Sequence, residues 1–352
     1  MLHRMFRYSL LTAVVVAIWL FALSAPAQNP SGTAGQSAPS AQNLPIWAYP
    51  VNAGAGRGRG APGARGGAGP AAAPDDGSPK HVPGSTAAYT ATQIRDLFNV
   101  PDWFPGSHPT MPEVVAQGRK PAVRACGYCH LPNGQGRPEN QSIAGLPAGY
   151  TVQQMDDFKN SLRKSSEPRM GSVNLMVQIA KAATDDDVKA AAAYFASLKP
   201  KPWIRVVEAD TVPKTRIAGG MLVLADGGGT EPIGQRIIEM PEDLERCELR
   251  DSTSGFVAYV PVGSIRKGEE LATTGGAGKT LRCGICHGPD LKGLGNVPSI
   301  AGRSPSQMVR QIIDIQNGAR NGPWTQLMKE SVAKLTSDDI VALGAYLASR
   351  TP

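Results

Sequence analysis

The hydrophobic pattern begins with one uninterrupted apolar run. Residues 10–23 carry no charge and follow Arg4 and Arg7. A positive start, a short apolar run and a small-residue cleavage site are typical of a signal peptide, which we assign to residues 1–27. An uncleaved N-terminal anchor is the competing interpretation, because the run is near the short limit for a membrane span. We expect no other membrane-crossing segment, and we expect export to the periplasm.

The pattern disappears over residues 28–88. Residues 53–74 contain only Ala, Gly, Arg and Pro. Such a composition cannot bury enough apolar surface to offset the entropy of the chain. We therefore predict a disordered linker over residues 28–88. Trp47 and Tyr49 form a lone apolar patch within it that could mark a docking motif.

Helical periodicity returns after residue 89. Residues 90–98 fit a short helix, and the prolines that follow predict irregular chain up to Pro109. Two later helix starts share one signature, in which Thr184 pairs with Asp187 and Thr336 pairs with Asp339. This spacing is that of a capping box, with Asp in place of the usual Glu.

These paired signals belong to an internal repeat. Cys-Gly-x-Cys-His occurs at 126–130 and at 283–287, and Ser-Ile-Ala-Gly follows at 142–145 and 299–302. Gln-Met occurs at 154–155 and 307–308, and Leu-Met at 175–176 and 327–328. A repeat of this kind predicts two copies of one small helical domain. We place them at residues 89–202 and 263–352.

The segment between the copies, residues 203–262, has a different periodicity. Short β-like runs occur at 204–208, 221–225, 235–239 and 256–260, separated by Gly and Pro. We therefore predict a β-rich insert. The predicted fold class is mainly α, with two tandem helical domains, this insert and the disordered N-terminal linker.

Cys-x-x-Cys-His is the attachment signature of c-type haem. Residues three and four apart share one face of a helix, so the two sulfurs and the imidazole of each copy project together. The predicted haem-attaching and iron-ligating side chains are Cys126, Cys129 and His130, and Cys283, Cys286 and His287. Zinc binding and thiol redox chemistry are the alternatives, but a histidine directly after both pairs is unusual for either. The cofactors predicted are two covalently bound haems c with iron.

The sixth iron ligand is a choice between methionines. Methionine is the usual partner of histidine in cytochromes c. Met155 and Met308 open an amphipathic pattern, where a methionine by default fills the core. Met176 and Met328 precede the final helix of each copy, where the chain could fold back over the open haem face. We predict Met176 and Met328 as ligands, with Met170 the runner-up in the first copy.

Charge and composition narrow the partners. The formal net charge is +7, of which the leader and the linker carry +2 each, leaving +3. A nucleic-acid partner therefore has little support, and the mild excess is compatible with an acidic redox partner. Aromatic residues make up only 6% of the chain, which is thin for two cores without a porphyrin. We expect Cys247 to be a partly buried single cysteine and His108 to have a surface or packing role.

With these motifs in place, both halves resemble class I cytochrome c domains, and the tandem resembles the dihaem cytochrome c4 family. The resemblance covers residues 111–198 and 263–349. It implies haems with histidine and methionine ligands, and a proline whose carbonyl fixes the proximal histidine. Pro298 matches that position, whereas the first half has Gln141, whose carbonyl could still orient His130.

The resemblance also implies periplasmic electron transfer without catalysis. The partners expected are redox proteins, namely a dehydrogenase, an oxidase or another cytochrome, and the chain could be the cytochrome subunit of a dehydrogenase complex. Membrane contact is expected only through an uncleaved N-terminal anchor. The alternative is a dihaem enzyme that oxidises a small substrate such as a sulfur compound, which requires an open or unusual iron position.

Overall fold

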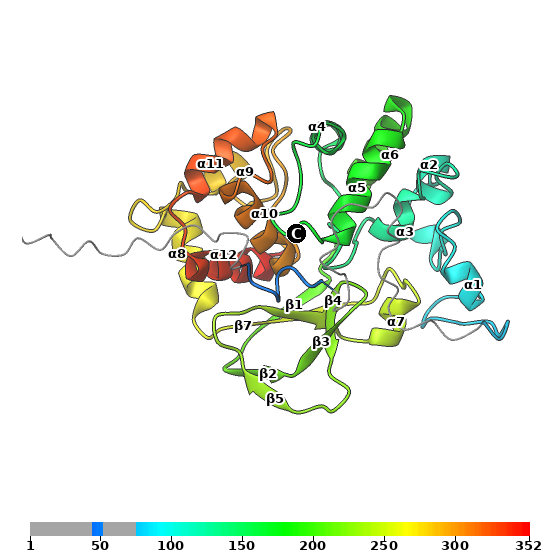
Figure 1. The fold of residues 1–352 in the computed structure, drawn as a ribbon, viewed down its shortest axis with the longest axis horizontal. Helices are drawn as coiled ribbons and strands as arrows, with labels where there is room; N and C mark the ends of the chain where they lie inside the picture. Colours follow the sequence, from blue (N-terminus) through cyan, green and yellow to red (C-terminus); the bar gives the residue numbers. More distant parts are fainter. Residues whose placement is uncertain (1–43, 52–74) are drawn as a thin grey trace, which may run out of the picture. The chain divides into compact units, whose positions relative to one another are not determined.

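Helices lie on both sides of a group of strands in this computed structural model (Figure 1). The structure describes residues 44–51 and 75–352. The predicted signal peptide and much of the predicted linker lie outside the described residues. Within the described residues, no helix has the length and apolar character needed to cross a bilayer.

The first half is helical, with short helices before longer ones. Thr90 and Gln93 form a capping box at the start of the first helix, which is shorter than predicted because the chain turns at Arg95. Pro105 opens a single 3₁₀ turn, so the proline-rich stretch is irregular as expected. The elements are α1 (Ala91–Ile94), η1 (Pro105–Ser107), α2 (Glu113–Ala116), α3 (Cys126–His130), α4 (Ala148–Lys159), α5 (Gly171–Ala182) and α6 (Asp185–Ser197).

The second half repeats the order from α2 to α6, with a 3₁₀ turn added before its fourth helix. Its elements are α8 (Ser264–Thr274), α9 (Gly284–His287), α10 (Pro305–Gln316), η2 (Pro323–Thr325), α11 (Gln326–Val332) and α12 (Ser337–Ser349). Helices α4 and α10 each have 12 residues, and α6 and α12 each have 13. The capping boxes predicted at Thr184 and Thr336 are both present and start α6 and α12. Local side-chain hydrogen bonds therefore set the same start for the final helix of each half.

Strands occupy the chain between the two helical parts. They are β1 (Ile204–Glu208), β2 (Thr211–Pro213), β3 (Thr215–Ala218), β4 (Met221–Leu224), β5 (Thr230–Pro232), β6 (Ile238–Pro241) and β7 (Phe256–Val260), with α7 (Leu244–Glu248) before β7. The main sheet has the order β1-β7-β6, with β1 parallel and β6 antiparallel to β7. The run predicted at 235–239 is shifted, because Gly234 has a φ of 56° and the strand begins only at Ile238.

The larger apolar core lies in the second half, where α12 packs against α8 and α10. Ile340, Leu343 and Leu347 are buried there. Gly268 lets α8 approach α12 closely, because a Cβ at this position would overlap the Ala342 carbonyl oxygen. Packing of this kind gives a helix most of its stability in a folded chain.

One part of the predicted linker is ordered, which corrects that prediction. Residues 44–51 form a turn against the second half, in which Ala48 is 0% and Tyr49 2% exposed. The Tyr49 hydroxyl donates to Asp314 Oδ1 at 2.9 Å, and Arg310 donates to the Ala48 carbonyl at 2.7 Å. Order also begins before Tyr89, whose backbone pairs with Lys80. The segment is ordered because its aromatic residues find a distant core, which composition alone does not reveal.

Asp339 joins the cap of α12 to two lysines, and its side chain is fully buried, whereas those of Lys267 and Lys279 are 43% and 46% exposed. It accepts from Thr336 and forms ion pairs with Lys267 and Lys279, both at 3.0 Å. Burial by itself raises the pKa of this carboxyl, but the hydrogen bonds from Lys267, Lys279 and Thr336 outweigh it and lower the pKa to about 2.

We expect Asp339→Asn to lower the free energy of unfolding by about 1–2 kcal/mol at neutral pH, because both ion pairs with the half-exposed lysines are lost and one of the two acceptor oxygens becomes an amide donor. The folded pKa lies below the unfolded value of about 3.9. The wild type's advantage over the variant is therefore complete above that pH and disappears as the pH falls toward about 2. Urea unfolding of both proteins between about pH 2 and pH 7 measures this stability difference. Asp338→Asn, at an exposed neighbouring carboxylate, is the control. A difference that does not change with pH would contradict the charge assignment.

Candidate functional site

The first Cys-x-x-Cys-His sequence forms the short helix α3. Cys126, Cys129 and His130 all line one pocket, together with residues from α4, α5 and α6. The helix ends at Leu131, where a φ of 62° turns the chain back toward the pocket. The structure therefore brings the three predicted first-half residues together on one side of a shared space.

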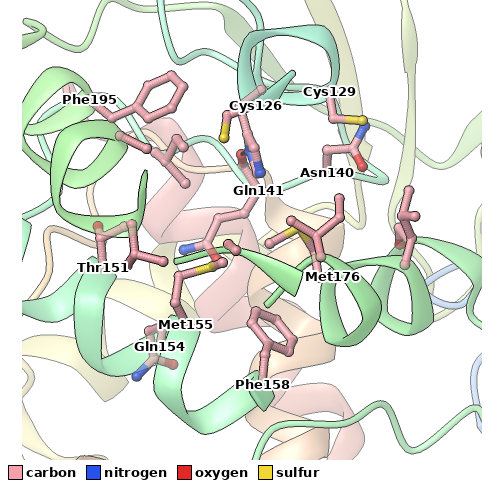
Figure 2. Close-up of a pocket in the computed structure, with 18 of the residues that line it drawn as sticks. Cys126, Cys129, Asn140, Gln141, Thr151, Gln154, Met155, Phe158, Met176 and Phe195 are labelled. Carbon is pink, nitrogen blue, oxygen red and sulfur yellow. Dashed lines mark hydrogen bonds between the residues drawn. The ribbon is translucent and has the colours of Figure 1, made fainter. Parts of the chain in front are cut away.

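The pocket is largely apolar and encloses about 1290 Å³ between atoms, its open mouth included. The apolar side chains that line it include Val114, Val123, Ile143, Leu146, Phe158, Leu175, Ile179, Val188 and Phe195. Figure 2 shows Met155, Phe158 and Met176 across the pocket from Cys126 and Cys129. A concave apolar space with a few converging polar groups is the usual form of a cofactor site.

Each motif histidine is held by a backbone carbonyl. His130 Nδ1 lies 2.8 Å from the Gln141 carbonyl oxygen, and His287 Nδ1 lies 2.8 Å from that of Pro298. We predicted that the Gln141 backbone carbonyl could orient His130 as the proline carbonyl does in the second half, and this contact confirms it. This contact leaves Nε2 of each ring as the nitrogen available to a metal.

Burial lowers the pKa of His130 and of His287, and the carbonyl contacts only partly oppose that effect. Both rings are therefore neutral near pH 7, which is the form that coordinates iron. The direction of these shifts suits an axial ligand better than a titrating base.

The four motif cysteines form no disulfide within the described residues. Burial raises the pKa of Cys126 to about 12 and of Cys283 to about 11, and it also raises the pKa of Cys129. Reactive redox cysteines have lowered pKa values, so Cys126, Cys129 and Cys283 do not resemble the thiols of a thiol–disulfide centre. Within the described chain, no group of three or more His, Cys, Asp and Glu side chains is arranged to hold a metal ion.

The structure narrows the choice of sixth iron ligand in the first half but leaves two methionines in the pocket. Met176 lies inside α5, which begins at Gly171 and continues beyond it, and so precedes the final helix of its half as predicted. It lines the pocket, but so does Met155 of α4, for which we predicted packing alone. Met170 is 3% exposed and lies outside the pocket lining.

The second motif has a similar backbone and a more open surrounding. Cys283 precedes α9, His287 is buried and Cys286 is exposed. Met308 of α10 and Met328 of α11 are both partly buried against the core of the second half. Packing thus leaves both methionines as possible ligands on this side.

Polar side chains at the first pocket come from both halves of the chain. Arg163 and Arg310 line the pocket, and both are buried. Arg163 donates to the side-chain oxygen of Gln141 at 3.0 Å and to that of Gln311 at 3.1 Å. Thr151 Oγ1 is buried in the lining and has no hydrogen-bond partner among the described residues.

These groups fit haem. Two guanidinium groups and an unpaired hydroxyl beside an apolar pocket suit a porphyrin with carboxylate side chains. Sequence reasoning missed Arg163, Arg310 and Thr151, because no local pattern marks a side chain that reaches the site from another element. The side-chain role of Gln141 was missed for the same reason.

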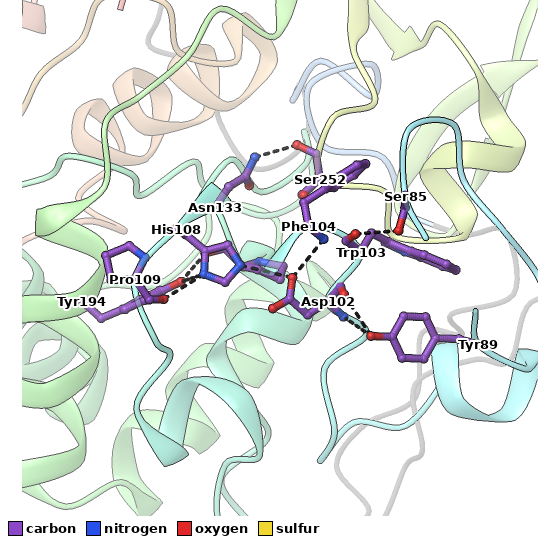
Figure 3. A network of polar contacts seen from close by, with 11 residues as sticks. Ser85, Tyr89, Asp102, Trp103, Phe104, His108, Pro109, Asn133, Tyr194 and Ser252 are labelled. Atoms are coloured by element: carbon purple, nitrogen blue, oxygen red, sulfur yellow. Dashed lines mark hydrogen bonds and ion pairs between the residues drawn. The ribbon is translucent and has the colours of Figure 1, made fainter. Parts of the chain in front are cut away.

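His108 is buried, as its predicted packing role allows, and lies outside the pocket lining. Its Nε2 is 3.2 Å from Asp102 Oδ1, and its Nδ1 is 3.1 Å from the Tyr194 hydroxyl (Figure 3). Tyr194 also donates to the Pro132 carbonyl at 2.7 Å, just after the motif. The network thus anchors the loop that follows His130 to α6. Cys247 is 2% exposed, more buried than we predicted.

Comparison with known proteins identifies similar chains. A family model described as cytochrome c matches residues 115–199. The chain is 30% identical over 133 residues to a cytochrome c4 of Stutzerimonas stutzeri, covering 34% of this chain and 63% of that relative's length. It is 30% identical over 84 residues to cytochrome c-554(547) of Halothiobacillus neapolitanus, covering 21% of this chain and 92% of the relative. It is also 25% identical over 235 residues to a thiosulfate dehydrogenase electron acceptor of Stutzerimonas stutzeri (strain A1501), covering 66% of this chain and 82% of the relative.

Gly136 allows the loop to return over His130. Its φ is 65°, and a Cβ would lie 2.6 Å from the Gln141 carbonyl oxygen that contacts the imidazole. We expect Gly136→Ala to lower the free energy of unfolding by at least about 2 kcal/mol, since left-handed backbone alone costs about 1–2 kcal/mol. Denaturant unfolding measures the loss. Gly171→Ala, with no atom within 4 Å of its Cβ, is the control. Equal stability of the two variants would show that the loop is not constrained here.

Proposed function

This chain belongs to the cytochrome c family and binds haem c covalently, and from that premise we propose that it is a periplasmic dihaem cytochrome that carries electrons between redox proteins. The observation that carries the proposal is the matched pair of motifs, each with its histidine 2.8 Å from a backbone carbonyl. Both halves would then be class I cytochrome c domains, within residues 89–202 and 263–352.

The attachment residues proposed are the two cysteines of each motif. Cys126 and Cys129 would hold one haem by thioether bonds, and Cys283 and Cys286 the other. His130 and His287 would each supply one axial nitrogen. The bound haem supplies reversible one-electron chemistry at its iron.

The protein's own residues then have defined tasks. The Gln141 and Pro298 carbonyls fix the orientation of each imidazole. Arg163 and Arg310 would offset the negative charge of the haem carboxylates at the first site, and Thr151 would donate to them. The apolar lining excludes water, so little solvent has to reorganise when the charge of the site changes.

For the sixth ligands we propose Met176 and Met328. Both lie on the helix that precedes the final helix of their half, and Met176 lines the pocket. An iron with two protein ligands has no open position for a substrate. This supports a carrier over the alternative, a dihaem enzyme that oxidises a small sulfur compound.

The partners proposed are redox proteins, with a dehydrogenase as the electron donor. A 25% identical relative is named a thiosulfate dehydrogenase electron acceptor, and a shorter match is named the cytochrome subunit of a sulfide dehydrogenase. A signal peptide over residues 1–27 would deliver the chain to the periplasm.

The deciding experiment is a haem count with oxidised and reduced spectra of protein expressed with a c-type haem maturation system, followed by carbon monoxide. We expect two haems per chain, low-spin in both states and indifferent to carbon monoxide. Carbon monoxide binding at one haem of the wild type would favour the enzyme. One haem per chain would refute the dihaem assignment.

Methionine variants identify the sixth ligands. Met176→Ala should make about half of the reduced haem bind carbon monoxide, because one iron loses its thioether. Met328→Ala should do the same for the other haem. Met155→Ala and Met308→Ala are the matched controls and should keep the wild-type spectrum. If a control opens an iron and its partner variant does not, the ligand assignment in that half is reversed.

A further inference from the structure

The strand-rich insert covers one face of the first haem-attachment motif. The Arg250 guanidinium stacks on the Tyr128 ring at 3.4 Å from its centroid and donates to the Tyr128 carbonyl at 2.7 Å. Arg137 donates to the Cys247 carbonyl at 3.5 Å. The residues that cover the motif fall within 247–254, which we call the covering segment.

Two further contacts extend this cover along the loop after the motif. Asn133 donates to the Ser252 carbonyl at 2.6 Å (Figure 3). Gln135 donates to the Ser254 carbonyl at 2.8 Å. Four first-half positions therefore contact the covering segment, and Tyr128 and Gln135 are only 8% and 9% exposed.

The same four positions exist in the second half. The two loops share their backbone bonds, for Gly136 N donates to the His130 carbonyl at 2.9 Å and Gly293 N to the His287 carbonyl at 2.8 Å. Counted from the motif cysteines, the residues equivalent to Tyr128, Asn133, Gln135 and Arg137 are Ile285, Asp290, Lys292 and Leu294.

All four of these second-half residues are exposed. Ile285 is 58% and Leu294 62% exposed, and Cys286 beside them is exposed too. We call this surface the open face. Tyr128 stacks with Arg250 and Arg137 donates to the covering segment, but their equivalents Ile285 and Leu294 are aliphatic. The open face therefore cannot be covered by the same contacts.

The charge on the open face is positive. Arg282 and Lys292 are exposed, and neither forms an ion pair within the described residues. Asp290 is the one acid among the four positions, and its carboxylate accepts from the Lys292 backbone N–H at 3.2 Å. Exposed aliphatic side chains with a cationic rim suit a partner that has an apolar centre and carboxylates around it.

We propose that the open face of the second motif, rather than the covered face of the first, is the docking surface for an acidic redox protein. The inference rests on the proposed carrier function and adds where the partner binds. A second copy of this chain fits less well, because a symmetric contact would bring two positive faces together. Electron exchange requires close approach, and the exposed Cys286 marks the edge that such a partner can reach.

The test uses the full-length protein with both haems, reduced beforehand, and an oxidised acidic blue-copper protein as the probe. Stopped-flow absorbance follows haem oxidation over a range of salt concentrations. We expect the wild-type rate to fall as salt rises, because screening weakens the attraction of opposite charges. Leu294→Asp, and independently Ile285→Asp, should slow the transfer about tenfold or more, because they place a charge in the apolar centre of the contact. Lys292→Glu should reduce the salt dependence.

Val262→Asp is the matched control, since Val262 is 62% exposed like Leu294 and receives the same added charge away from the motif. It should transfer at the wild-type rate. Equal rates for Leu294→Asp and the wild type would overturn the proposal, as would a wild-type rate that does not fall with salt. Loss of a wild-type dimer in Leu294→Asp, seen by sedimentation, would overturn it in favour of a second copy.

Reduction by ascorbate separates this failure from failure of the carrier function. If ascorbate fully reduces both haems of the wild type, Leu294→Asp and Ile285→Asp, a negative docking result concerns the surface alone. If ascorbate cannot reduce the wild type, the carrier function fails and the docking proposal fails with it.

Discussion

The contact between the proximal imidazole and a backbone carbonyl is the constraint on which the rest of each half depends. It requires the chain to leave the motif, reverse direction and return within hydrogen-bond distance of Nδ1. Two backbone bonds make that return possible in each half, and Gly136 and Gly293 supply the left-handed conformation it needs. Helices α4 and α10 follow this loop directly along the chain, so the path of the loop determines where each helix begins.

Given that common frame, the two halves differ in what surrounds the motif. In the first half, burial of the motif is shared between the pocket lining and the insert, and Arg250 on Tyr128 closes the outer side. In the second half, Cys286 and Ile285 remain exposed. All four positions that contact the covering segment in the first half differ in the second. The two largest changes are Tyr128 to Ile285 and Arg137 to Leu294, and with them the contacts that cover the first motif are absent from the second.

Features that depend on neighbours in sequence could be predicted, and those that depend on distant contacts could not. The motif helices, both Thr–Asp capping boxes and the strands at 204–208 and 256–260 follow from local spacing and periodicity. The order of residues 44–51 could not be predicted, since Tyr49 is stabilised by Asp314 from the far end of the chain. Met155 appeared to be a core residue because its helical pattern is amphipathic, and the same buried face proves to line the pocket.

Two arginines, the buried Arg303 and the half-buried Arg320, connect the two halves, and their hydrogen bonds make this junction polar. Arg303 donates to the Ser142 and Ala144 carbonyls at 3.0 and 3.1 Å, and Arg320 donates to the Tyr150 hydroxyl at 2.8 Å. Burying a guanidinium is costly unless most of its donors are paired, so acceptors from the opposite half help to accommodate each arginine. Such directional bonds specify one arrangement of the halves, whereas an apolar contact would tolerate sliding. The loop that holds His130 is part of this junction because Arg163, which donates to the Gln141 side chain, also donates to Gln311 of the second half at 3.1 Å. The geometry of one redox site is therefore linked to the position of the other half.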